Sequence, residues 1–381
     1  MSKSIIKIKS PGLLSTIQDL GRYGFQHLGI PESGAMDKFA LRVGNSLLGN
    51  PENAAAIEIT AIGPSLTFLE NIEIVITGGN LSPEINGTKV PQWKNILISK
   101  NDQLTFGDII DGFRSYICIK GGIDCPEILS SKSTYLKGQF GGIEGRSLNE
   151  NDIIFVNENQ NNLQLSKELP IEYTHPIYGK HHILKIILGP QNYSFTDNAL
   201  STLVESQYKI SLDSDRVGYR LEGPVLEHKD KPDILSDGSP PGAIQIPGNG
   251  TPTILMADRG TTGGYAKIGT IISTDISQIA QASPGQTVTF QIVSQEEAST
   301  FRITQEQIFV DLGNYPSIMK SEKQKLVHIT DNKSNLRAFT KNGLPLTSNE
   351  DLSLSSEKLF RTTVTTKKTS YTFDLDVREI E

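Results

Sequence analysis

The chain has 381 residues and a formal net charge of −7, and 36% of its residues are hydrophobic. Its 34 glycines and 19 prolines favour short strands joined by turns over long helices. No basic stripe is present, which argues against a nucleic-acid groove, and no apolar run resembles a signal sequence or approaches the ~20 residues of a membrane span. We therefore expect a cytoplasmic protein that binds neither nucleic acid nor membrane.

The first half of the chain is predicted to be β-rich with one clear helix. Residues 5–9 alternate like an opening strand, and residues 36–48 carry an apolar stripe at helical spacing that Gly49 terminates. The Asn86-Gly87 step predicts a hairpin. Further strands are predicted at 56–60, 65–69, 72–77, 95–99, 115–120 and 152–156.

A second β-rich unit follows a polar, proline-containing stretch at about 157–180. Its strands are predicted at 183–188, 217–221, 243–246, 253–257, 268–272 and 287–293, with helical turns at 275–281. Residues 320–358 are rich in polar side chains and predict a partly flexible segment, whereas 370–377 alternate like an edge strand. The predicted chain is mainly β, with domains at 1–180 and 181–300 and an extension at 301–381.

Metal binding is not predicted. Cys118 and Cys125 lie seven positions apart, which fits neither a zinc knuckle nor a redox pair. The adjacent His181 and His182 would point to opposite faces of a strand, so they would chelate poorly.

Two glycine-containing segments of the first half hold polar side chains on turns. The first contains Gln18, Asp19, Arg22 and Asp37, and a structural corner with Asp37 at the start of the helix is its simpler interpretation.

The second segment runs from Lys120 to Arg146 and contains several glycine pairs. Such pairs let backbone N–H groups approach a ligand, so Lys132 and Arg146 are predicted to bind an anion. The order of a phosphate-binding P-loop is absent, and a cluster of turns remains the alternative.

The densest group of polar side chains lies between two apolar strands, from Asp258 to Lys267. Paired donors and acceptors there match an amide or carboxylate substrate, and a wide polar hairpin is the alternative. Asp258 and Lys267 are predicted to act in acid–base chemistry or in stabilising negative charge. The predicted substrate-binding residues nearby are Gln245, Thr261, Thr262, Tyr265, Arg216 and Arg220.

Long ordered motifs in the chain resemble one protein family. The run SPGLLSTIQDLGRYGFQHLGIPESGAMD and the later KGGIDCPEILSSKSTY, FGGIEGR, GAIQIPGNGTP and ADRGTTGGYAKIG are similar to the signatures of the family that contains KipA, the second subunit of allophanate hydrolase and the C subunit of 5-oxoprolinase. The resemblance covers about residues 5–298. It implies two cyclophilin-like β-barrel domains with a few short helices.

The same resemblance implies a function that needs partners. The chain would be one subunit of an ATP-dependent 5-oxoprolinase, which opens 5-oxoproline to glutamate, or of a related carboxyltransferase or amidolyase. A KipI-like subunit (the first subunit of allophanate hydrolase, or the B subunit of 5-oxoprolinase) would complete its site, with a LamB/YcsF-type subunit in the full enzyme. The chain alone would be inactive and would bind no cofactor, and ATP would be used by the complete complex.

The alternative function belongs to a different class. In one branch of the family the KipA-like member is a regulatory binding protein that antagonises a KipI-like inhibitor of a kinase. A neighbouring gene for a LamB/YcsF-type subunit would favour the enzyme, and a neighbouring histidine kinase gene would favour the regulator.

Overall fold

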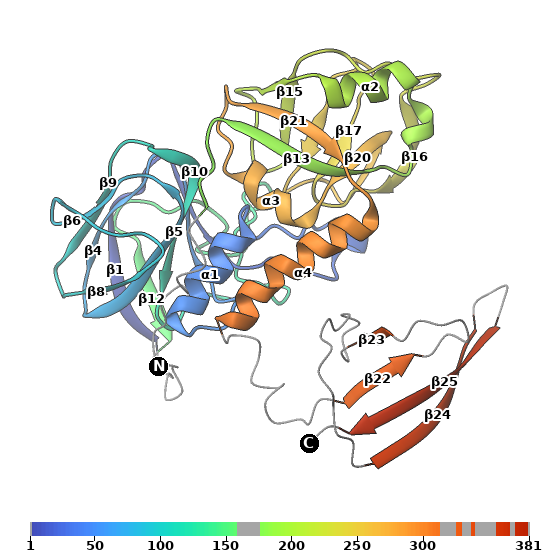
Figure 1. Cartoon of the computed structure of the whole chain (residues 1–381). Coiled ribbons are helices and arrows are strands. Elements are labelled where there is room, and N and C mark those ends of the chain that lie inside the picture. The colour runs from blue at the N-terminus through green and yellow to red at the C-terminus, as the bar shows by residue number, and fades with distance from the viewer. Residues whose placement is uncertain are drawn as a thin grey trace. The chain divides into compact units, whose positions relative to one another are not determined.

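The structure is a computed structural model that describes residues 2–157 and 176–312, together with strands between residues 325 and 379 (Figure 1). The chain divides into two compact units, Met1–Leu312 and Gly313–Glu381. The first unit holds all the predicted site residues.

The first half of this unit is built from two sheets. One has the strand order β11-β12-β1-β4-β9-β6-β7, and the other has the order β2-β3-β10-β5-β8. The strands are β1 (Ser2–Ser10), β2 (Leu14–Gln18), β3 (Ala56–Thr60), β4 (Ser65–Phe68), β5 (Ile72–Asn80), β6 (Pro83–Ile85), β7 (Thr88–Lys89), β8 (Asn95–Ile98), β9 (Gln103–Phe106), β10 (Asp111–Ile119), β11 (Ile123–Asp124) and β12 (Ile153–Asn157).

The two sheets enclose one core of branched aliphatic side chains. Ile8 and Leu66 from one sheet pack with Ile57, Ile74 and Ile117 from the other, and all five are fully buried. Each such side chain contributes roughly 1.5–3 kcal/mol on burial. The predicted hairpin is confirmed, because β6 and β7 pair across two residues of positive φ.

The predicted helix is confirmed as α1 (Lys38–Leu48). It begins two residues later than predicted because Asp37 is its N-cap, where Asp37 Oδ1 accepts a hydrogen bond of 2.9 Å from the Ala40 N–H. It ends at Gly49, whose φ of 70° is readily adopted by glycine. Its apolar face, including Val43 and Leu47, packs with residues of β5 and β10.

The second half closes into a barrel with the strand order β13-β20-β17-β18-β15-β14-β21. Its first and last strands, β13 and β21, pair in parallel and complete the ring. A separate two-stranded ribbon is formed by β16 and β19. The elements are β13 (His181–Leu188), α2 (Asp197–Glu205), β14 (Tyr208–Ile210), β15 (Gly218–Glu222), β16 (Asp233–Gly238), β17 (Ala243–Gln245), β18 (Thr253–Leu255), β19 (Thr262–Tyr265), β20 (Lys267–Ile271), α3 (Ser273–Ala280) and β21 (Thr287–Ile292).

The mainly β fold class is confirmed by these sheets and this barrel. The helical turns predicted at 275–281 correspond to α3, which begins two residues earlier at Ser273 and ends at Ala280, and short 3-10 helices occupy Gln26–Leu28 and Asn192–Ser194. The division of the first unit into two domains near residue 180 stays a prediction.

A 17-residue helix, α4 (Gln295–Asp311), follows the barrel and was not predicted. It begins with a capping box in which Ser294 and Glu297 bond each other's backbone N–H groups. It lies beside α1 and α3 (Figure 1), and its Phe309 is buried in the core around α1. Glu306 binds the Arg42 guanidinium of α1 through two bonds of 2.7 Å. Helix α4 therefore joins the barrel to the first half.

The second unit contains one sheet with the order β23-β22-β25-β24. The strand predicted at 370–377 is confirmed as β25 (Ser370–Glu379), but its edge position was wrong, because it pairs with β22 (Lys325–Ile329) and β24 (Ser356–Thr365). Strands β22 and β23 (Arg337–Phe339) lie inside the stretch 320–358 that was predicted to be partly flexible. The other residues of that stretch up to residue 355 lie outside the described residues.

In the described ranges no helix has the length and apolarity to cross a membrane, and no group of three or more His, Cys, Asp or Glu residues is arranged to hold a metal ion.

Candidate functional site

Two of the predicted site residues meet on neighbouring barrel strands. Gln245 at the end of β17 is the register partner of Lys267 at the start of β20, so their side chains share one face of the barrel wall. Gln245 is 8% exposed and Lys267 is 1% exposed. Ser239, in the loop between β16 and β17, is 6% exposed and lies close to Gln245, because Ser239 Oγ and Gln245 Nε2 both border Gly263.

All three side chains hold polar atoms without a hydrogen-bond partner among the described residues: Gln245 Nε2, Lys267 Nζ and Ser239 Oγ. Gly263 on β19 makes this arrangement possible, because a Cβ atom there would lie 2.3 Å from Gln245 Nε2 and 3.2 Å from Ser239 Oγ. Burying unpaired donors is costly, so such a set of atoms indicates a ligand or water site. We call Ser239, Gln245 and Lys267 the donor cluster.

One carboxylate lies near the donor cluster. Asp237 Oδ2, on the β16–β19 ribbon, is 3.0 Å from Lys267 Nζ, although the angles fall outside hydrogen-bond geometry. Asp237 is half exposed and also accepts a bond of 3.2 Å from Gln191 Nε2. The Lys267 ammonium lowers the pKa of the Asp237 carboxyl group. The ammonium therefore keeps donors for a second acceptor.

The donor cluster suits an anionic or carbonyl oxygen. An amide N–H₂, an ammonium and a hydroxyl are all donors, and a ligand with a carboxylate or a polarised carbonyl would supply the acceptors. The buried ammonium would also stabilise negative charge that develops on such an oxygen.

A second group of charged residues lies between the barrel and the first half. Arg216 bonds the Asp258 carboxylate through Nε at 2.9 Å and through Nη2 at 3.2 Å. Its Nη1 binds Glu58 of β3, and its Nη2 also donates to the Gly34 carbonyl oxygen at 2.7 Å. Burial opposes the charge of this guanidinium, but Asp258 and Glu58 together raise its pKa above the ordinary value. Arg216 is thus fully engaged in joining the two halves.

The remaining oxygen of Glu58 extends this network into the first half. Glu58 Oε2 accepts bonds of 2.8 Å from the Met36 N–H and from the Tyr116 hydroxyl. A network of this kind fixes the start of α1 relative to the barrel.

Arg259 connects the charged network with the donor cluster. Its Nε donates to the Ser239 carbonyl oxygen at 2.6 Å, and its Nη2 lies 3.4 Å from Glu32 of the first half. Burial lowers the pKa of Arg259, and the charge of Glu32 opposes that effect. Because Asp258 precedes Arg259 directly, both groups of polar residues belong to one continuous region.

The structure gives the two predicted catalytic residues different partners. Asp258 is held by Arg216, whereas Lys267 faces Asp237, and no hydrogen bond or ion pair joins Asp258 to Lys267 in the described part of the chain. Their catalytic assignment stays a prediction, but the geometry favours Lys267 for contact with a ligand.

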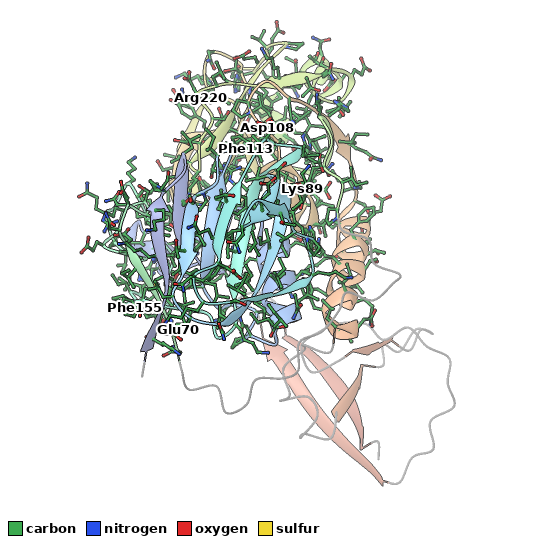
Figure 2. The ribbon with its side chains drawn as sticks, turned by 90° about the vertical axis from the view of Figure 1, so that its left-hand side faces the viewer. Glu70, Lys89, Asp108, Phe113, Phe155 and Arg220 are labelled. Carbon is green, nitrogen blue, oxygen red and sulfur yellow. The ribbon has the colours of Figure 1, made fainter. Side chains whose placement is uncertain are left out.

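The other predicted binding residues of the second half lie at the periphery. Thr262 and Tyr265 are exposed on β19, and Thr261 is half buried. Arg220 points to solvent on β15, with its side chain 66% exposed, and pairs with Asp213 at 3.8 Å. Figure 2 shows its place among the strands of the second half. The structure does not bring Arg220 to the donor cluster.

The two predicted anion-binding residues of the first half have partners of their own. Lys132 Nζ donates to the Ile123 carbonyl oxygen at 3.0 Å. Arg146 makes two bonds to Asp152, at 2.7 and 3.0 Å. Both side chains therefore have internal partners, and their assignment to anion binding stays a prediction.

Three residues of this region were not predicted to lie at the site. Ser239 and Asp237 precede Pro240-Pro241, a signal for a turn but not for a ligand site. Glu58 interrupts the apolar strand β3 and is fully buried. A carboxylate within an apolar strand is the signal that could have identified it, because buried acids are paired.

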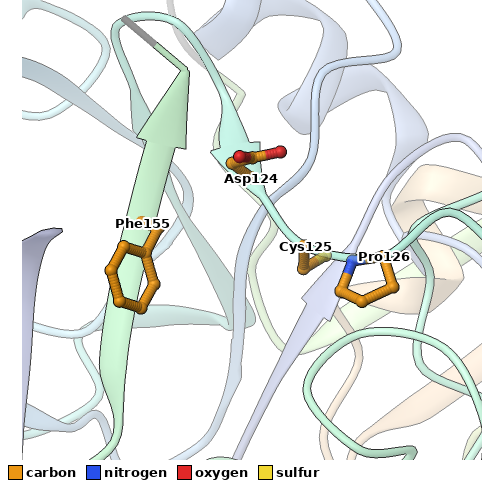
Figure 3. Close-up of a pocket in the computed structure, with 4 residues that line it drawn as sticks. All are labelled: Asp124, Cys125, Pro126 and Phe155. Atoms are coloured by element: carbon orange, nitrogen blue, oxygen red, sulfur yellow. The ribbon is translucent and has the colours of Figure 1, made fainter. Parts of the chain in front are cut away.

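A separate hollow of about 390 Å³ lies near β11 and β12 and is lined by Asp124, Cys125, Pro126 and Phe155 (Figure 3). Burial raises the pKa of the Cys125 thiol to about 11, so this thiol is protonated at neutral pH. The hollow contains none of the donor cluster.

The fold and the site agree with a family assignment. Residues 28–292 match the model of the carboxyltransferase domain, subdomain A and B, and the chain belongs to this family. The matched range includes Glu58, Arg216, Asp258 and the donor cluster.

Two relatives are similar to this chain over most of their length. The chain is 36% identical over 307 residues to the C subunit of 5-oxoprolinase from Haemophilus influenzae, covering 81% of this chain and 96% of the relative. It is 34% identical over 312 residues to the C subunit of 5-oxoprolinase from Escherichia coli, covering 81% and 98%. The chain therefore belongs to the family of 5-oxoprolinase C subunits.

A solved structure extends the likeness to a much longer enzyme. The crystal structure of the K. lactis urea amidolyase matches with a TM-score of 0.77 and 26% identity, covering 90% of this chain. This chain spans only 22% of the length of that protein.

Proposed function

We propose that the chain is a subunit of an ATP-dependent 5-oxoprolinase and acts with a KipI-like partner subunit. The observation that carries the proposal is the donor cluster. Gln245 and Lys267 are register partners on neighbouring strands, and Gln245 Nε2 and Ser239 Oγ both border Gly263. All three donor atoms are buried without a hydrogen-bond partner among the described residues. The names of the relatives at 34–36% identity support this choice of substrate.

The chemistry of 5-oxoproline suits these donors. The molecule carries a carboxylate and a lactam carbonyl, both of which accept hydrogen bonds. Gln245 and Ser239 would orient one acceptor, and Lys267 would stabilise the oxyanion that forms when the lactam carbonyl is attacked. Asp258 would act through Arg216 as a positioning residue, because both of its oxygens are already bonded.

The partner subunits complete the proposed enzyme. A subunit of the KipI type would cover the donor cluster, and a LamB/YcsF-type subunit would join them in the ATP-dependent complex. The chain alone would then be inactive, because its donors hold an acceptor but supply neither ATP nor the attacking group.

Reconstitution tests the proposal. The three subunits are mixed and glutamate release from 5-oxoproline is measured with and without ATP, leaving out each subunit in turn. Lys267→Met should lower the rate about 10²-fold or more, because it removes the charge that stabilises the oxyanion. Arg220→Met removes an equal charge from the surface and should leave the rate unchanged.

Two results would contradict the proposal. Undiminished activity in the absence of this chain would remove it from the enzyme. Full activity of the Lys267→Met complex would show that the donor cluster is not the substrate site.

A further inference from the structure

Arg22 lies in the loop after β2 and is the largest fully buried side chain among the described residues. Its Nη2 donates to the Ser133 carbonyl oxygen at 2.5 Å, and the ring of Phe140 lies 4.8 Å from the guanidinium carbon. The Nε and Nη1 atoms of Arg22 have no hydrogen-bond partner among the described residues. A guanidinium thus retains N–H groups on two sides in a place without solvent contact.

The positive charge of Arg22 has no carboxylate in direct contact within the described ranges. Asp19 is near in sequence, but its oxygens accept bonds from Ser131 Oγ at 2.8 Å, from the Lys132 N–H at 2.6 Å and from the Gly21 N–H at 2.8 Å. Burial lowers the pKa of Arg22, while the more distant charges of Asp19 and Asp258 oppose that effect. An uncompensated buried charge is costly, so a stable fold favours an anion beside it.

Two further buried polar atoms belong to segments that pack against Arg22. Gln18 donates from Nε2 to the Thr134 carbonyl oxygen at 3.1 Å, next to the carbonyl that Arg22 binds, and its Oε1 is unpaired within the described residues. Ser33 follows Glu32, whose carbonyl oxygen accepts the Arg22 N–H at 2.7 Å, and Ser33 Oγ is also unpaired there. The segments that contact Arg22 therefore carry an unpaired hydroxyl and an unpaired amide oxygen.

The cover over Arg22 requires glycine. Gly141 has φ of 78°, and a Cβ atom there would lie 1.9 Å from the Ser133 carbonyl oxygen and 2.9 Å from Arg22 Nη2. A side chain at position 141 would therefore displace the guanidinium. Because glycine has no side chain, the backbone at position 141 can pack directly against Ser133 and the Arg22 guanidinium.

We propose that Arg22, with Ser33 and Gln18, binds a small oxyanion of the carboxylate, hydrogencarbonate or hydrogenphosphate type. The free N–H groups of Arg22 and the Ser33 hydroxyl donate to its oxygens. Gln18 Oε1 accepts from its O–H group where the anion is protonated. This site lies in the first half and does not use the donor cluster of the barrel, so it does not depend on the proposed oxoprolinase activity.

Calorimetric titration of the full chain without partners tests the proposal. Formate, bicarbonate and inorganic phosphate are titrated separately at constant ionic strength, so that the three arms identify the anion. We expect saturable binding with one anion per chain for at least one of them. Arg22→Met should weaken it at least tenfold, and Ser33→Ala about threefold to tenfold, as for the loss of one hydrogen bond.

Thermal unfolding separates binding from a purely structural role. The bound anion should raise the unfolding temperature of the wild type and of Arg220→Met, which removes an equally charged but exposed arginine. It should not raise that of Arg22→Met. The proposal is overturned if none of the anions binds saturably, or if Arg22→Met binds and is stabilised as the wild type is. If Arg22→Met does not fold, Ser33→Ala decides, and unchanged affinity in that variant overturns the proposal.

Discussion

Replacing Arg216 with methionine should destabilise the first unit without leaving a large cavity. Arg216 neutralises two buried carboxylates, Glu58 and Asp258, whose side chains are 1% and 5% exposed. Removing one partner of a buried ionic group costs about 3–5 kcal/mol, because the remaining charges lose their compensation. Methionine retains the apolar stem of the side chain, so most of the loss would come from the charge.

The expected change in melting temperature follows from the size of the unit. Unfolding entropy is about 2.1 cal/mol/K per residue. For a unit that ends at Leu312 this amounts to about 0.65 kcal/mol/K, so a loss of about 3–5 kcal/mol lowers the melting temperature by about 5–8 °C. Differential scanning calorimetry of the purified chain measures this shift.

The control is Arg220→Met, which removes an exposed arginine four positions away and should shift the melting temperature by less than about 1–2 °C. Adding Glu58→Gln and Asp258→Asn to Arg216→Met should restore part of the loss, because it neutralises the uncompensated charges. An Arg216→Met chain that melts with the wild type would refute the role assigned to the network.

Three further results are expected. Gly263→Ala should lower glutamate formation by the reconstituted complex at least tenfold by displacing Gln245, while Gly264→Ala, whose added Cβ would be 3.6 Å from its nearest neighbour, should not. Burial lowers the pKa of His182 below 6.5, so protonation of His182 opposes folding. The free energy of unfolding of the wild type, measured in urea, should be full above pH 6.5 and should fall as the pH drops through the pKa of the folded state. His182→Leu should flatten this fall, whereas His181→Leu, at an exposed position, should not. Burial raises the pKa of Asp37 above 3.8, so the contribution of Asp37 to stability decreases as the pH rises from 3.8 through the pKa of the folded state. The loss of unfolding free energy caused by Asp37→Asn should therefore be largest in acid. A loss that grows with pH would contradict the assignment.

The sequence predicted those elements whose pattern is local. The stripe of α1 and the Asn86-Gly87 turn can be identified without knowledge of distant residues, and both are present. Helix α4 was missed because Phe309 is its only buried residue, so its apolar periodicity is weak. Its capping box, Ser294 with Glu297, was the available signal.

The site was predictable only in part, because some of its contacts join residues that are distant in sequence. Gln245 and Lys267 flank one motif, and their pairing across β17 and β20 brings them together. Arg216 was expected to bind substrate, but its partner Glu58 lies 158 positions earlier in the chain. No local pattern indicates a contact of that sequence separation, and none indicated that Ser239 would lie next to Gly263.

The ion pair between Arg216 and Glu58 also has a consequence for how the unit of residues 2–312 can be combined with other domains by gene fusion. Either half expressed alone would carry a charge that its counterpart normally neutralises, and α4 would lose one of the surfaces on which it packs. Gene fusion or recombination would therefore preserve this charge pairing only if residues 2–312 were transferred together. A break near residue 165 would leave Glu58 in one fragment and Arg216 in the other, so each fragment would be less stable alone than in the joined unit.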